Sequence, residues 1–501
     1  MTNGFIRYEK KNGIEYASVY QAKRVGSKKI NDIKWLGRVI NKEKGIFKSR
    51  EKGTFTFTLD GGIISDTNLP SANEKLILDF GDSYFLNEIL ERNRFKSLIK
   101  ATFGDLADTV MSLIFYRSLQ QGANYYAQIW WEGSYARVLY PNASLASQRI
   151  SETLKLIGDE RLQRNFFCEY LKFIAPLCGK GILLDSTGLP NDICFPLTAI
   201  NSHGGKINKE TRLVLVLDKD SGMPVYFRYA AGNIVDVSTL KATLCEIKAY
   251  GIDICHAVID AGYYSETNIR AMQKSQISFV IRMVPNRKKY KDLIREYTDD
   301  IEDAKYLVKY RDRFVYIKRA EIDLFGKTGY AYIALDIDRK HDEVKKYIRG
   351  AFDNNDISPE DMNAEMQRKG LFILVASDPI CTTDILPLYY TRQAIEQVFD
   401  IGKNNTDLLP LRVHSLESFR GHLLLSFLTS AVYVMVNKAL KKTDVCAIGA
   451  YRIFRNLKCK VFDSVIVVQE ANKKMNDIAK IVKLNFPVEL PLICGEKNGG
   501  K

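Results

Sequence analysis

The sequence predicts an α/β protein whose central mixed sheet is preceded by a small β module and a helical region and is interrupted by a β-rich insertion. Two observations predict this class. In the middle of the chain, short apolar runs that end in acidic or turn-forming residues alternate with stretches of helical periodicity. The composition, 46% hydrophobic with 13 prolines, is typical of a globular protein with a sizeable core. With 501 residues, the chain has room for about three domains.

The charge balance indicates a polyanionic partner. The chain holds 73 Lys and Arg against 59 Asp and Glu, a net charge of +14. Such an excess favours nucleic acid first and an anionic membrane surface second. The longest apolar run, residues 423–436, is shorter than the roughly 20 residues that span a bilayer, so we interpret it as a buried helix and expect no membrane association.

The cysteines and histidines predict neither a disulfide framework nor a zinc site. Nine cysteines are scattered without a Cys-x-x-Cys pair, and the five histidines show no paired ligand spacing. The first thirteen residues are polar and carry no apolar segment of the kind found in secretory signals. These features predict a protein of the reducing cytoplasm.

Two modules are expected before the central sheet. Residues 1–60 alternate apolar with polar side chains and predict a small β-rich module. Its expected strands span residues 16–21, 33–40 and 53–59. Residues 75–180 show helical spacing, and 142–158 followed by 159–174 predicts two helices joined by a tight turn. This pair is either a DNA-reading helix-turn-helix or simply two packed helices, and the residues leave both interpretations open.

The first part of the central sheet is expected at residues 181–285. The elements follow in the order β, β, β, α, β, α, β, which is that of a ribonuclease-H-like sheet. Asp185 and Asp260 end its first and fourth strands, which lie side by side in such a sheet. Two carboxylates in one cavity repel each other unless cations are present. Their hard oxygens suit magnesium or manganese.

The rest of the chain is expected to interrupt and then complete this sheet. Residues 286–370 predict a β-rich insertion, and residues 371–436 predict a return to the sheet with a long helix at 388–404. The insertion is locally basic, and we expect its basic side chains to lie along DNA, with two of Arg311, Arg313 and Lys318 on one strand face. The alternative is that these charges only keep a surface strand soluble. Residues 437–501 are expected to be helical and to end in a polar tail at 495–501.

The long helix carries a spaced set of four functional side chains: Tyr389, Arg392, Glu396 and Lys403. At about 100° per residue, offsets of 3, 7 and 14 place all four within an arc of roughly 60° on one helix face. The alternative is an ordinary solvated charged face. We favour a functional face, because it combines an aromatic ring, a guanidinium, a carboxylate and an ammonium group.

This set resembles the Tyr-Arg-Glu-Lys signature of bacterial insertion-sequence transposases of the DDE class, those grouped with insertion sequence family four. The segment from Asp185 to Leu189 is similar to that family's first motif, and the segment from Val258 to Ser265 is similar to its second. The long gap between Asp260 and Glu396 also resembles the family, whose members carry a β-rich insertion there. The resemblance covers about residues 181–436.

The resemblance implies that Asp185, Asp260 and Glu396 are catalytic and hold two Mg²⁺ or Mn²⁺ ions, while Tyr389, Arg392 and Lys403 bind DNA. Tyr389 could also serve only to pack against the sheet. The implied activity is cleavage at transposon ends and transfer of the 3′-hydroxyl into target DNA. The implied partners are the terminal inverted repeats, target DNA and a second copy of the chain in a synaptic complex, at the nucleoid of a prokaryotic cytoplasm.

Two other functions remain open. A nuclease on the same fold would use the same carboxylates to cut DNA without joining it. A catalytically silent relative would only bind DNA, although a pure binder gains little from clustered acids beside a phosphate backbone. The residues of the expected metal site do not separate a transposase from a nuclease, because hydrolysis and strand transfer use the same ligands.

Overall fold

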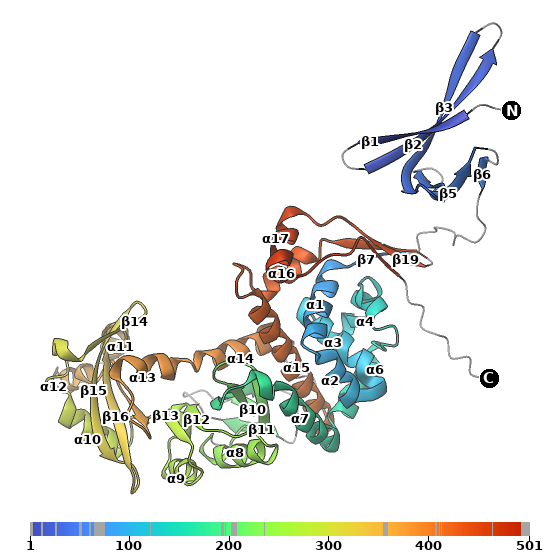
Figure 1. Cartoon of the computed structure of the whole chain (residues 1–501). Helices are drawn as coiled ribbons and strands as arrows, with labels where there is room; N and C mark the ends of the chain where they lie inside the picture. The colour runs from blue at the N-terminus through green and yellow to red at the C-terminus, as the bar shows by residue number, and fades with distance from the viewer. Residues whose placement is uncertain are drawn as a thin grey trace. The chain divides into compact units, whose positions relative to one another are not determined.

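The chain is described by a computed structural model (Figure 1). The structure describes residues 4–11, 14–25, 28–49, 53–59, 62–64, 76–120, 122–191, 195, 197–201, 208–234, 236–353, 359–405, 408–409, 411, 413–462 and 464–491. It divides into two compact units. One unit comprises residues 82–453, and the other combines residues 1–81 with residues 454–501.

Helices dominate the chain before the central sheet, as the sequence predicted. They are α1 (Gly81–Arg92), α2 (Phe95–Phe103), α3 (Ala107–Leu119), α4 (Ala127–Glu132), α5 (Ala136–Leu139), α6 (Ser147–Ile157) and α7 (Glu160–Ile174). Helices α6 and α7 are the predicted pair. The Asp159 side chain accepts a hydrogen bond from the Leu162 amide, 3.0 Å, and so caps the first turn of α7. The two helices are confirmed, and a DNA-reading role for them stays a prediction.

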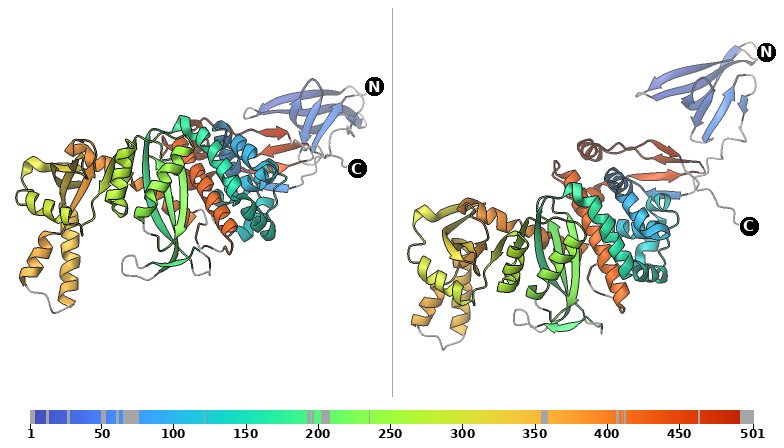
Figure 2. Two further views of the ribbon diagram at one scale, coloured as in Figure 1. Left: turned by 90° about the horizontal axis from the view of Figure 1, so that it is seen from below. Right: turned by 60° about the horizontal axis from the view of Figure 1, so that its bottom comes forward.

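Helix α15 (Leu416–Leu440) is the core helix of the larger unit. It contacts α3, α6, α14 (Gln393–Asn405) and β11 (Pro224–Ala231), the edge strand of the central sheet. Figure 2 shows it between the amino-terminal helices and that sheet. By length and composition alone it could cross a membrane, but 72% of its most apolar stretch is buried inside the protein. The buried helix predicted at residues 423–436 is therefore confirmed.

Two glycines allow α15 to approach α6 closely. A Cβ atom on Gly421 would lie 1.9 Å from the Leu154 carbonyl oxygen, and one on Gly158 would lie 1.8 Å from that of Glu417. Both distances are far below van der Waals contact, and the atoms concerned are backbone atoms that cannot swing aside. The contact between these helices therefore requires glycine at both positions.

A buried polar chain links α3, α15 and the segment that follows α14. The Arg117 guanidinium donates hydrogen bonds to Ser426 Oγ, 2.9 Å, and to His422 Nδ1, 3.2 Å. The opposite ring nitrogen, Nε2, donates to the Leu408 carbonyl, 3.1 Å, and the Leu408 amide donates to the Gly402 carbonyl. Burial, and then the charge of Arg117, lower the pKa of His422 to about 3. The imidazole is therefore neutral, as these hydrogen bonds require.

The central sheet is mixed and follows the order β11-β10-β8-β12-β13-β17-β16-β15-β14, with β9 beside β10. Its strands are β8 (Gly181–Pro190), β9 (Ala199–Asn201), β10 (Asn208–Asp218), β11 (Pro224–Ala231), β12 (His256–Ile259), β13 (Ser278–Arg282), β14 (Leu307–Tyr310), β15 (Arg313–Asp323), β16 (Thr328–Asp336) and β17 (Leu371–Ala376). Helices α8 (Leu240–Ala249) and α9 (Glu266–Lys274) flank β12 in the chain. The predicted α/β class and mixed sheet are confirmed.

The expected insertion differs from the prediction in two respects. Its strands β14 to β16 join the central sheet through the pairing of β16 with β17, so they extend that sheet. The segment also contains α10 (Lys288–Tyr297), α11 (Ile337–Asp353) and α12 (Pro359–Gln367), so it is mixed rather than β-rich. The pattern of β16 explains the pairing, because its second half is buried on both faces, as an internal strand must be.

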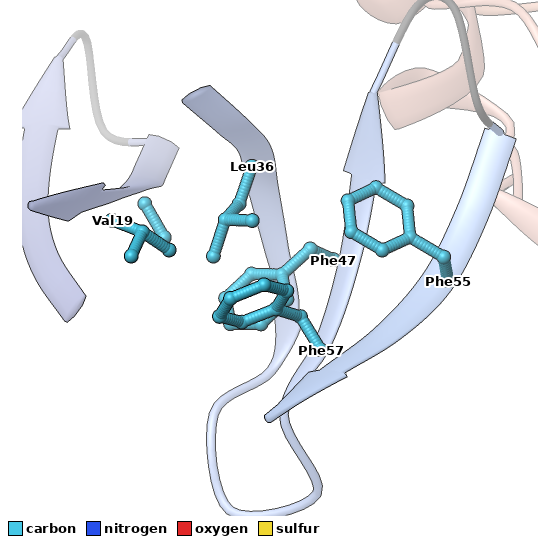
Figure 3. Close-up of a cluster of buried hydrophobic side chains, with 6 residues drawn as sticks. Val19, Leu36, Phe47, Phe55 and Phe57 are labelled. Carbon is cyan, nitrogen blue, oxygen red and sulfur yellow. The ribbon is translucent and has the colours of Figure 1, made fainter. Parts of the chain in front are cut away.

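The other unit contains an antiparallel sheet at the amino terminus. Its strands are β1 (Gly4–Lys11), β2 (Ile14–Val25), β3 (Lys28–Asn41), β4 (Ile46–Ser49), β5 (Gly53–Thr58) and β6 (Gly62–Ile64). Its core consists of Ala17, Val19, Leu36, Phe47, Phe55 and Phe57, and Figure 3 shows the five larger side chains converging between the strands. The small β module predicted from the sequence is confirmed.

The carboxyl-terminal region differs from its prediction. Helices α16 (Ala447–Phe454) and α17 (Lys473–Ile481) alternate with β18 (Lys458–Val461), β19 (Val465–Val468) and β20 (Glu489–Pro491). These strands form a four-stranded sheet with β7 (Leu76–Asp79). The expectation of an all-helical region is wrong, because the β-branched run of β19 favours a strand once partners are available. The predicted polar tail at residues 495–501 lies outside the described residues.

Candidate active site

The pairing of β8 with β12 brings two of the predicted acids together. The strands are parallel, and Leu184 is the register partner of Ile259. Asp185 is the next residue on β8 and Asp260 is the residue that follows β12, so they lie side by side. The expectation that Asp185 ends its strand is wrong, because β8 continues to Pro190 through its pairing with β10. The Asp185 side chain is only 13% exposed, and the Ser186 amide donates a hydrogen bond to its Oδ1, 2.8 Å. The adjacent strands expected from the sequence are confirmed.

The predicted signature helix is broken into α13 (Thr382–Tyr390) and α14 (Gln393–Asn405). Tyr389 belongs to α13, and Arg392 lies in the turn between the helices. The expectation of one continuous helix is therefore wrong. The turn is tightened by i to i−3 hydrogen bonds, such as the Arg392 amide to the Tyr389 carbonyl, 3.3 Å. The Thr391 hydroxyl also donates to the Leu388 carbonyl, 2.7 Å, and competes with helical bonding there.

The broken helix still brings the predicted residues together around Arg392. Its guanidinium lies 2.5 Å from Asp185 Oδ2, 3.4 Å from Asp260 Oδ1 and 3.3 Å from Glu396 Oε1. Burial by itself would lower the pKa of Arg392, but the charges of Asp185, Asp260 and their neighbours outweigh burial and raise it. One half-buried cation thus contacts carboxylates from β8, from the end of β12 and from α14.

Tyr389 lies beneath this cluster. Its side chain is buried, and its hydroxyl donates a long hydrogen bond to Asp260 Oδ1, 3.4 Å. Burial raises the pKa of Tyr389, while the charge of Arg392 opposes the shift, so the hydroxyl keeps its proton at neutral pH. In this arrangement the ring packs inside the protein and the hydroxyl orients Asp260.

Lys403 lies further along α14 and contacts a residue that the sequence analysis missed. Its ammonium group donates to Thr187 Oγ1, 2.6 Å. Burial lowers the pKa of Lys403, and the charges of Glu210 and Asp400 oppose the shift. Thr187 is two residues beyond Asp185 on β8, so both side chains project from the same face of the strand. The alternation of side chains along a strand was therefore the signal in the sequence that could have identified Thr187.

The donor types fit a divalent cation, although the distances are those of an ion-pair cluster. No group of three or more His, Cys, Asp or Glu side chains within the described ranges is close enough to hold a metal ion. Each of the three carboxylates instead contacts the Arg392 guanidinium. The donors are all carboxylate oxygens and already surround one cation, and this is the chemistry that Mg²⁺ and Mn²⁺ prefer.

The three basic side chains singled out in the segment before β17 contact other residues of the protein. Lys318 is buried and forms an ion pair with Asp300. Arg313 pairs with Asp336 at 3.2 Å, and Arg311 donates to Gln393 at the start of α14, 3.0 Å. The expectation of contact with DNA is therefore wrong for Lys318, whose side chain is buried and whose ammonium group pairs with the exposed carboxylate of Asp300.

Comparison with known proteins gives one family match. The model of the transposase DDE domain family matches residues 176–432, which is more than half of the chain. A search of curated proteins finds no match. A similar solved structure is the cryo-EM structure of a piggyBac transposase synaptic complex with hairpin DNA, at 9% identity and a TM-score of 0.38, covering 75% of this chain and 70% of that one. On the family match, this chain belongs to the DDE-domain transposases.

Proposed function

We propose that this transposase cuts DNA at the ends of its element and joins the freed 3′-hydroxyl to target DNA. In this proposal Asp185, Asp260 and Glu396 hold two Mg²⁺ or Mn²⁺ ions. The observation that supports it is the convergence of these three carboxylates, from β8, the end of β12 and α14, on one guanidinium inside the region that matches the family. The specific resemblance to the Tyr-Arg-Glu-Lys group remains part of the proposal.

The three acids differ in how firmly they are held. A pair of divalent ions, when bound, would activate the attacking oxygen and stabilise the leaving oxygen of an in-line displacement. Asp185 is fixed within a central strand and is mostly buried, so it would hold a cation with little movement of its side chain. Glu396 is 57% exposed on the first turn of α14, so its side chain has room to adjust as DNA approaches.

The neighbouring side chains have separate proposed roles. Arg392 neutralises the acids in the present arrangement, and its planar fork would pair with a DNA phosphate once cations engage the carboxylates. Lys403 beside Thr187 would contact phosphate as a point charge. Tyr389 would hold Asp260 in place through its hydroxyl, because its buried ring offers little surface for stacking on a base.

Arg392→Gln is expected to make the stability of the protein depend on divalent ions. Without the guanidinium the carboxylates repel one another, and we expect a loss of about 2 kcal/mol in the absence of divalent ions, less than for a fully buried pair. Added Ca²⁺ or Mn²⁺ should then raise the melting temperature of the variant more than that of wild type. Differential scanning fluorimetry with EDTA or with each ion measures both effects.

The matched control is Arg270→Gln, which removes the exposed Arg270–Glu266 ion pair on α9. Such a pair contributes little, so its loss should leave the response to divalent ions unchanged. An equal response of wild type and Arg392→Gln to Ca²⁺ would show that the guanidinium does not occupy the cation site.

DNA is the proposed partner, and its support is the family together with the net charge of +14. We propose that the site binds the terminal inverted repeat of the element first and then target DNA beside the cleaved end, so that the 3′-hydroxyl and the target phosphate meet there. We further propose that two copies of the chain act together on paired ends, at the nucleoid of a prokaryotic cytoplasm. The net charge also predicts that binding weakens steeply as salt rises.

Joining separates the proposed transposase from a nuclease. The substrate is a duplex of the element end with a preformed 3′-hydroxyl, mixed with supercoiled plasmid and Mg²⁺. The duplex carries a label, and we expect the label to appear in open circular plasmid to which the element end has been joined. The matched control is the same end with a 3′-deoxy terminus, which is still bound but has no oxygen to attack. Cleavage of an uncut end without any joined product from the hydroxyl substrate would favour the nuclease.

A further inference from the structure

The first three strands of the amino-terminal sheet have two faces of different character. On the inner face Ala17, Val19 and Leu36 pack into the hydrophobic cluster (Figure 3). Successive side chains of a strand project to opposite sides, so Tyr20 on β2 and Trp35 on β3 lie on the outer face. The inner face therefore stabilises the module, whereas the side chains of the outer face are not part of this core.

The outer face carries large aromatic and aliphatic side chains that are exposed to solvent. Phe5 is 59% exposed and Trp35 is 60% exposed, and Ile33 is also exposed. Phe5 pairs in register with Tyr20, and their rings stack with centroids 5.4 Å apart and planes 11° apart. Tyr20 in turn pairs with Ile33. A contiguous exposed apolar patch of this kind marks an interaction surface.

Cations lie directly beside these rings. The Arg7 guanidinium carbon is 5.8 Å from the centre of the Tyr20 ring, and the Lys11 ammonium is 5.7 Å from that of Trp35. Glu9 pairs with both cations, at 3.1 Å and 4.0 Å. Two positive charges thus share one carboxylate, and the face is positive as well as aromatic.

The charge of the whole module points to a polyanion. Residues 1–60 contain 14 Lys and Arg against 6 Asp and Glu, a net charge of +8 out of +14 for the entire chain. Two such modules would repel each other, so a second copy is a poor occupant of this face. A strand of nucleic acid offers both negative charge and flat apolar rings.

We propose that this outer face, formed by Phe5, Arg7, Lys11, Tyr20, Ile33 and Trp35, binds single-stranded DNA. Unpaired bases lie against the aromatic side chains, and Arg7 and Lys11 pair with the flanking phosphates. The bases of intact duplex are stacked on each other and do not present their flat faces, so single strands are preferred. The inference goes beyond the proposed catalytic function, because it involves none of the residues around Arg392.

The test measures DNA binding by the full-length chain without catalysis. Asp185→Asn protein in EDTA is titrated into a fluorescein-labelled oligothymidine of about 20 nucleotides, which exceeds the site of one small single-strand-binding module. We expect Trp35→Ala and Phe5→Ala each to weaken binding by at least about fivefold, as removal of a stacking side chain does elsewhere. Arg7→Gln with Lys11→Gln should flatten the salt dependence by about 0.7 for each phosphate that is no longer neutralised.

Matched controls separate stacking from general effects. Trp35→Phe keeps an aromatic ring and should bind nearly as well as the parent. Tyr125→Ala removes an equally exposed ring just before α4 and should leave binding unchanged within about twofold. Binding to single strands should quench the emission of exposed Trp35, and Trp35→Phe should lose that part of the quenching. Far-ultraviolet circular dichroism and thermal unfolding confirm that each variant is folded.

Three outcomes would overturn the proposal. If Trp35→Ala and Phe5→Ala lost equal affinity for single-stranded and for duplex DNA, the face would contact the phosphate backbone and would not stack on bases. Unchanged DNA binding in Trp35→Ala, with a dimer becoming monomeric by light scattering, would show that a second copy covers the face. Unchanged binding and unchanged mass would show that the patch binds neither. None of these outcomes affects the joining assay, so the catalytic proposal is tested separately.

Discussion

Asp185→Asn, Asp260→Asn and Glu396→Gln are each expected to reduce cleavage at the element end by roughly a thousandfold or more, as removal of essential catalytic groups does in other enzymes. Each substitution keeps the volume of the side chain and removes a charged ligand from the cluster around Arg392. Binding of the uncut end should stay within several-fold of wild type. Single-turnover cleavage in Mg²⁺ and fluorescence anisotropy in Ca²⁺ measure the two quantities.

Asp253→Asn provides the control for this series. Asp253 is an exposed aspartate just before β12, at the opposite end of that strand from Asp260, where it pairs loosely with Lys180 at 3.8 Å. Its replacement removes the same charge near the other end of that strand and should leave cleavage unchanged. Cleavage at the wild-type rate by any one of the three cluster variants would remove that residue from the proposed metal site.

Gly421→Ala is expected to destabilise the larger unit by about 1–3 kcal/mol, the usual cost of forcing atoms into a packed interior. The new methyl group would lie 1.9 Å from the Leu154 carbonyl oxygen, so α6 and α15 must move apart. Such a movement also disturbs the buried contacts of His422, the next residue on α15. Urea unfolding followed by circular dichroism measures the change in the free energy of unfolding.

Gly350→Ala is the matched substitution with the opposite expected sign. Gly350 also lies within a helix, α11, but a Cβ atom there would meet nothing within 4 Å. Alanine should therefore stabilise the protein by about 0.5–1 kcal/mol through its higher helix propensity. If Gly421→Ala were as stable as Gly350→Ala, the close contact of α6 with α15 would be contradicted.

The central sheet was predictable because local hydrophobic patterns indicate the order of its strands and helices. Apolar runs end at Asp185 and Asp260, and the sequence between them alternates strand and helix in a recognisable order. Adjacent parallel strands then place the two acids side by side. Helical spacing also singled out Arg392 and Glu396. Arg392 pairs with both of those acids and with Glu396, and the catalytic and DNA-binding roles of the two residues stay predictions.

Other features depended on contacts that no local pattern reveals. The break at Thr391 arises from tightened hydrogen bonds within a sequence of good helical periodicity. The strand β18 pairs with β7, whose residues are nearly 380 positions earlier, so a local window at Lys458 shows no partner. The contact between Lys403 and Thr187 likewise depends on how α14 lies along β8, a relation set by tertiary packing.

The long separation between α3 and α15 has a consequence for how the protein is made. Arg117 and His422 are hydrogen-bonded partners 305 residues apart, and α15 also covers α6. On the ribosome, the amino-terminal helices emerge first and keep an uncovered apolar surface until nearly the whole chain has been synthesised. Residues 75–180, although contiguous and helical, are therefore not a separable module. A prematurely terminated chain would expose that surface and be a substrate for aggregation or proteolysis instead of a free DNA-binding fragment.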